Sequence, residues 1–186
     1  MSNFLKNVCY LAFLTGFLFA CNPQQPVAQV GNTGFEANFK GGGTGFYTID
    51  SKTGQLSYMV DYGEDAGNWR KFGNKYRENG TSQLHFKAVE RGGNFGSSFY
   101  ILNGGTGQVS FMLDYGEGAG TWTGFGNPLR NVTVTEFETN FTPSGMIFYV
   151  YDGVAKKMHF MQDFGERAGA WQSYGCLLYT SDAADE

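Results

Sequence analysis

The chain has 186 residues and a formal net charge of −4 at neutral pH, and 41% of its residues are hydrophobic and 17% aromatic. A chain of this length can bury one compact core. The charges form no basic patch, which excludes nucleic acid as the expected partner.

The N-terminal segment has the pattern of an export signal. Lys6 precedes an almost continuous apolar stretch at residues 8–20, which is too short to cross a membrane because a spanning helix needs about 20 apolar residues. The next residues, Leu18-Phe19-Ala20-Cys21, resemble the lipobox of bacterial lipoproteins. This resemblance implies that residues 1–20 are a signal peptide, that Cys21 is lipidated, and that the protein is anchored to a bacterial membrane on the periplasmic side or at the cell surface. The alternative is an ordinary secretory signal that contains Cys21 by chance.

Residues 21–33 are expected to form a flexible tether between the lipid and the folded part, because they are rich in Pro, Gln and Asn. At the other end, residues 176–186 read CLLYTSDAADE and interrupt a repeat. Over their whole length they resemble the translation of a transposase-type sequencing adapter, which implies a non-native tail. Once this tail and the signal peptide are set aside, no disulfide is expected in the mature protein.

An internal repeat organises the rest of the chain. The segments 46–73, 99–126 and 148–175 align without a gap, and ten positions are identical in all three. The shared pattern is F-Y, then M-x-D-[YF]-G-E-x-A-G-x-W-x-x-[FY]-G. The pattern predicts a domain over residues 34–175 that is built from three repeats, at 34–80, 81–130 and 131–175.

Each repeat is predicted to consist of strands. In the first copy, residues 46–50 are rich in β-forming residues, 51–54 have the composition of a turn, and 55–61 alternate between apolar and polar positions. A further strand is expected before each hairpin, at 35–39, 84–89 and 134–141, and the tryptophan segments can supply a short fourth strand. The predicted fold class is therefore all-β. A β-trefoil-like threefold closure is favoured. The alternative is a fragment of a β-propeller, which would need further blades because propellers have four or more.

The candidate ligand-binding residues are the acids and the tryptophan of the shared pattern. A carboxylate beside an exposed aromatic ring is suited to binding a sugar, and two carboxylates near a glycine turn could instead bind Ca²⁺. The alternative is structural: the aspartate caps a turn, and the tryptophan fixes the packing between repeats at similar burial in all copies. The candidate residues are Asp61, Glu64, Trp69, Asp114, Glu117, Trp122, Asp163, Glu166 and Trp171.

Three functions remain open at this point. The first is a non-catalytic binding module of the cell envelope, similar to the lectins that its repeats weakly resemble over residues 34–175, with a glycan or an envelope protein as its partner. The second is a structural or protein-interaction scaffold. The third is a glycoside hydrolase, which is disfavoured because three equivalent acid pairs are unlike one tuned catalytic pair. No cofactor, metal site or catalytic residue is expected, since no catalytic or metal-binding motif is present.

Overall fold

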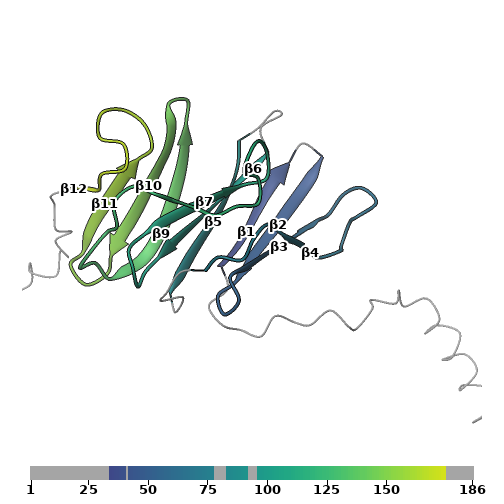
Figure 1. The fold of residues 1–186 in the computed structure, drawn as a ribbon, viewed down its shortest axis with the longest axis horizontal. Helices are drawn as coiled ribbons and strands as arrows, with labels where there is room; N and C mark the ends of the chain where they lie inside the picture. The colour runs from purple at the N-terminus through teal and green to yellow at the C-terminus, as the bar shows by residue number, and fades with distance from the viewer. Residues whose placement is uncertain (1–33, 41, 78–82, 92–95, 175–186) are drawn as a thin grey trace, which may run out of the picture.

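The computed structural model describes residues 34–40, 42–77, 83–91 and 96–174 (Figure 1). The predicted signal peptide, the predicted lipidation site Cys21, the predicted tether and the tail of residues 176–186 lie outside the described residues.

The all-β prediction is confirmed, because the described residues form strands and no helix. Twelve strands form three antiparallel sheets of four, and in every sheet the strands are adjacent in chain order. The first sheet contains β1 (Gly34–Lys40), β2 (Gly43–Asp50), β3 (Gln55–Val60) and β4 (Arg70–Phe72). The second contains β5 (Leu84–Glu90), β6 (Ser97–Asn103), β7 (Val109–Leu113) and β8 (Thr123–Phe125). The third contains β9 (Val134–Thr142), β10 (Gly145–Asp152), β11 (Lys157–Gln162) and β12 (Gln172–Tyr174).

The central hairpin of each sheet is closed by one side chain at the end of its first strand. Asp50, Asn103 and Asp152 each accept backbone N–H groups two and three residues further on, at 2.8 to 3.2 Å. These Asx turns satisfy the backbone donors of the turn locally. The turn ends in a left-handed residue in all three copies, and the third copy keeps this conformation although Lys156 replaces the glycine there.

The three sheets stack in a row, and the core lies in the two layers between them (Figure 1). The first strand of each sheet contacts the first strand of the next sheet, β1 with β5 and β5 with β9. The middle sheet is therefore covered on both faces, and all seven residues of β6 are buried. Neighbouring sheets exclude water from both sides of this strand.

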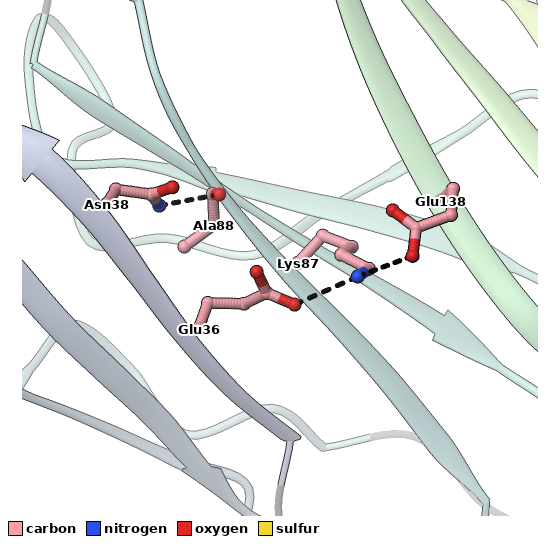
Figure 2. A network of polar contacts seen from close by, with 5 residues as sticks. All are labelled: Glu36, Asn38, Lys87, Ala88 and Glu138. Atoms are coloured by element: carbon pink, nitrogen blue, oxygen red, sulfur yellow. Dashed lines mark hydrogen bonds and ion pairs between the residues drawn. The ribbon is translucent and has the colours of Figure 1, made fainter.

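A chain of polar contacts joins the three first strands (Figure 2). The ammonium group of Lys87 on β5 lies 3.0 Å from a carboxylate oxygen of Glu36 on β1 and 2.8 Å from one of Glu138 on β9. Burial lowers the pKa of Lys87, but the hydrogen bonds that its ammonium group donates to both carboxylates outweigh this effect, so the pKa is raised overall. Asn38 on β1 also donates to the carbonyl of Ala88 on β5 at 2.7 Å. These contacts fix the position of each sheet along the strand direction relative to the next sheet.

Strands of different repeats share no sheet in the described part of the chain, and no sheet closes into a barrel. The repeats are therefore held together by side-chain packing and a few hydrogen bonds between sheets.

Candidate functional site

The aspartate of the shared pattern closes the end of its own hairpin in every copy. The backbone N–H of Ser97 donates to the Asp114 carboxylate at 2.7 Å, and the N–H of Asp114 donates to the Ser97 carbonyl at 3.1 Å. The same two-way contact joins Asp163 with Met146, and Asp61 with Thr44. A carboxylate that accepts a backbone N–H has one oxygen less for a ligand, and here the aspartate completes the ladder between the second and third strands.

The loop that follows the aspartate has one conformation in all three repeats. The first and last glycines of the loop have positive φ, between 73° and 76°, in every copy. In the second repeat the N–H of Gly120 donates to the carbonyl of Leu113 at 2.8 Å and closes the loop. Glu64, Glu117 and Glu166 are all exposed on it. The glycines recur because side chains disfavour this backbone region, so backbone geometry accounts for much of the shared pattern.

The tryptophans of the second and third repeats connect each repeat to the one before it. The indole N–H of Trp122 donates to the carbonyl of Asn74 at 3.0 Å, and that of Trp171 donates to the carbonyl of Asn127 at 2.9 Å. Both rings are partly buried and pack against the layer between two sheets. Trp122 also contacts the Tyr76 ring edge-on, with centroids 5.5 Å apart. These two tryptophans are packing residues between repeats.

Trp69 in the first repeat has a different environment. It is 36% exposed, and among the described residues no preceding sheet lies against it. A packing role predicts similar burial for all three tryptophans, and Trp69 is the most exposed of the three. The reason is its position at the start of the array, since its neighbouring residues share the pattern of the other copies.

Other members of the shared pattern lie at the same contact between repeats. Phe99 and Met112 in the second repeat, and Phe148 and Met161 in the third, are at most 2% exposed, and all four point toward the preceding sheet. Two glycines also meet there, because a side-chain carbon added to Gly126 would lie 2.9 Å from the Cα atom of Gly169. The N–H of Asn127 then donates to the carbonyl of Gly169 at 2.7 Å. Close backbone approach at this point explains why both positions lack a side chain.

In the second repeat, the acid and the tryptophan of the shared pattern line two different cavities. Trp122 lines a cavity of about 270 Å³ together with Asn74, Tyr76 and Arg77. Asp114 lines a different cavity, of about 300 Å³, which Tyr47 and other aromatic side chains surround.

Sequence reasoning missed the polar partners of Tyr47, which lines the second of these cavities. The Tyr47 hydroxyl lies 3.1 Å from a carboxylate oxygen of Glu90 and 3.1 Å from the Ser97 hydroxyl, which also contacts Glu90. Burial raises the pKa of Tyr47 well above its ordinary value, although the hydrogen bond to Ser97 opposes this. Tyr47 belongs to the recurring F-Y pair, but its partners lie outside the shared pattern, so only the stacking of sheets brings them together.

Two further searches concern only the part of the chain that the structure describes. It contains no group of three or more His, Cys, Asp or Glu side chains placed to hold a metal ion. It also contains no helix long and apolar enough to cross a membrane. One histidine has a polar partner, since His159 Nδ1 lies 3.0 Å from the Ser173 hydroxyl.

A comparison with known proteins finds no matching family, no matching curated protein and no matching solved structure. A proposal for function therefore depends on the structure of the repeats. The shared residues described above mainly pack one repeat on the next.

Proposed function

We propose that this protein is a non-catalytic scaffold of the bacterial cell envelope, anchored through a lipid on Cys21, whose repeats form an interaction surface. The observation that carries the proposal is the use of the shared residues. Trp122 and Trp171 donate to the preceding repeat, and the aspartates cap backbone N–H groups. Residues that recur in every copy are thus engaged in building the array, as expected of a repeat scaffold.

We infer further that the sheets stack like the blades of a propeller. Four-stranded sheets arranged face to face, with their first strands in contact, support this stacking. The trefoil-like closure over three repeats has less support, because each repeat keeps a sheet of its own.

The lipid anchor is tested with Cys21→Ser. The unchanged protein should incorporate labelled fatty acid and fractionate with membranes, whereas the variant should do neither, because the thiol that carries the diacylglycerol is gone. A variant at Cys9, inside the predicted signal peptide, is the matched control and should keep the label. Absence of label in the unchanged protein would contradict the anchor.

Carbohydrate binding is a second candidate, and one observation favours it. Trp69 is the exposed member of the tryptophan set, and Glu64 and Asp65 lie in the loop before it. An exposed indole beside carboxylates can cover the apolar face of a sugar ring. A glycan array tests this candidate: Trp69→Ala should abolish binding that Trp122→Phe retains. If the unchanged protein binds no glycan, the candidate fails and the scaffold proposal is unaffected.

A further inference from the structure

Within the part of the chain that the structure describes, the two ends of the array present apolar faces that no other sheet covers. The head face is the free side of the first sheet, and the tail face is the free side of the third sheet. The head face contains Phe35, Phe39, Phe46, Met59 and Trp69. The tail face contains Tyr149, Tyr151, Met158, Phe160 and Tyr174. Cross-strand pairing places the members of each set on one side of their sheet, except that Trp69, which precedes β4, is assigned by its equivalence to Trp122.

The head face has the same key residues as two surfaces that are covered inside the chain. Phe46 and Met59 occupy the positions that are Phe99 and Met112 in the second repeat. Those two are buried against the preceding sheet, whereas Phe46 and Met59 are only partly buried. Phe39, next to them on β1, is 77% exposed. The first repeat therefore has an interface surface that is ready for a preceding sheet.

The tail face matches the other side of the same interface. In the two internal contacts, the aromatic residue of the fourth strand packs on the phenylalanine of the next repeat: Phe72 on Phe99 with ring centroids 5.9 Å apart, and Phe125 on Phe148 at 6.0 Å. The third repeat has Tyr174 at this position, and Tyr174 is 55% exposed. It lies stacked on Phe160 with the centroids 4.7 Å apart.

A second aromatic contact recurs in the same way. The tyrosine of the F-Y pair packs on the phenylalanine of the next repeat, with centroids 5.2 Å apart for Tyr47 and Phe99 and 5.3 Å apart for Tyr100 and Phe148. Tyr149 is the equivalent residue of the third repeat, and it is only partly buried. Head and tail thus carry the two halves of a contact that the chain makes twice within itself.

We propose that the tail face of one copy of this protein docks on the head face of a second copy. Tyr149 and Tyr174 of one copy then pack on Phe46 of the other, as their equivalents do inside the chain. Exposed aromatic residues gathered on one face are typical of an interaction site. This inference deepens the proposed scaffold function by naming its partner, whereas the fatty-acid assay above tests the anchor alone.

Such a head-to-tail contact uses two different surfaces, so it leads either to a closed ring or to an open filament. In either assembly, a copy with a neighbour on each side has both its head face and its tail face covered.

Charge affects this contact in a predictable direction. Inside the chain, Lys87 separates Glu36 from Glu138. At the junction between copies, Glu138 of one copy would approach Glu36 of the other without a lysine between them. Added salt screens this repulsion between like charges, so association should not weaken as the salt concentration rises.

The test uses complementary variants of the full chain with two different affinity tags. Trp69→Ala removes an aromatic ring from the head face, and Tyr174→Ser removes one from the tail face. Each variant alone should associate with itself about thirtyfold more weakly than the unchanged protein, as expected for an aromatic hot spot. A mixture of the two should still form heterodimers, because one intact head and one intact tail remain. Val154→Ser, in an exposed turn of the third repeat, is the matched control and should leave association unchanged.

Capture of one tag with detection of the other measures association, and light scattering in detergent measures the mass. Co-capture of the two variants with each other, but not of either with itself, would support the proposal. A protein that stays monomeric at all concentrations would overturn it. A dimer that Trp69→Ala breaks and Tyr174→Ser leaves intact would also overturn it, because the contact would then be head to head.

Discussion

Replacing Gly126 by alanine tests the contact between repeats directly. Gly126 has φ of 67°, and an added methyl carbon would lie 2.5 Å from the Met161 sulfur and 2.9 Å from the Gly169 Cα atom. The substitution therefore combines two costs: the left-handed conformation of an L-residue, about 1–2 kcal/mol, and overpacking of the interface, about 1–3 kcal/mol. We expect the free energy of unfolding to fall by about 2–5 kcal/mol.

Gly116→Ala is the matched control because it carries only the first cost. Gly116 has φ of 73°, and no atom lies within 4 Å of the position that a methyl carbon would take. Urea unfolding followed by circular dichroism should show a decrease of about 1–2 kcal/mol for this variant. The difference between the two variants then measures the contact between the second and third repeats. Equal losses would refute the reasoning, because they would mean that Gly126 and Gly169 do not pack together.

Three further predictions follow from single side chains. Asp114→Ala should lower the free energy of unfolding by about 1–3 kcal/mol, because it leaves a buried N–H without its acceptor; Asp61→Ala, whose donor is exposed, should cost less in the same urea titration. Lys87→Met should reduce the free energy of unfolding by about 1–3 kcal/mol, because the partly buried carboxylate of Glu36 and the more exposed carboxylate of Glu138 lose their charged hydrogen-bond donor, and added salt should shrink the difference in melting temperature. Burial lowers the pKa of His85 in the folded state, so the stability that its neutral form contributes is present above about pH 6.5 and is lost as the pH falls below it. His85→Gln should flatten this acid limb of a stability-versus-pH curve, and the remaining slope should come partly from His159, whose pKa burial also lowers.

The strands and hairpins could be predicted from the sequence because local chemistry determines them. The turn at residues 51–54 is specified by Asp50, whose side chain accepts two nearby N–H groups, and by Gly54 with φ of 68°. The same chemistry recurs at fixed spacing, so the repeat alone predicts the strands before and after each turn. The fourth strand also forms directly after each tryptophan, as at β4 after Trp69.

The order in which the sheets stack could not be predicted, because it depends on contacts far apart in the sequence. Asn38 bonds to Ala88 across 50 residues, and Trp122 bonds to Asn74 across 48. Neither contact leaves a local pattern in the sequence. For the same reason the sequence could not show that one tryptophan position, identical in three copies, would be exposed at Trp69 and engaged in the other two.

The residues shared by the three repeats have different environments, and this difference suggests a physical reason for their recurrence. Phe46 and Met59 are only partly buried within their own chain, yet they match the buried Phe99 and Met112. Within one chain, Phe46 and Met59 gain little free energy from burial, since the hydrophobic contribution of about 25 cal/mol per Å² applies only to area removed from water. A head face of aromatic residues left in water would instead favour nonspecific aggregation. Covering that face with an equivalent sheet would give Phe46 and Met59 the same environment as their counterparts, so one interface accounts for the shared residues in all three repeats.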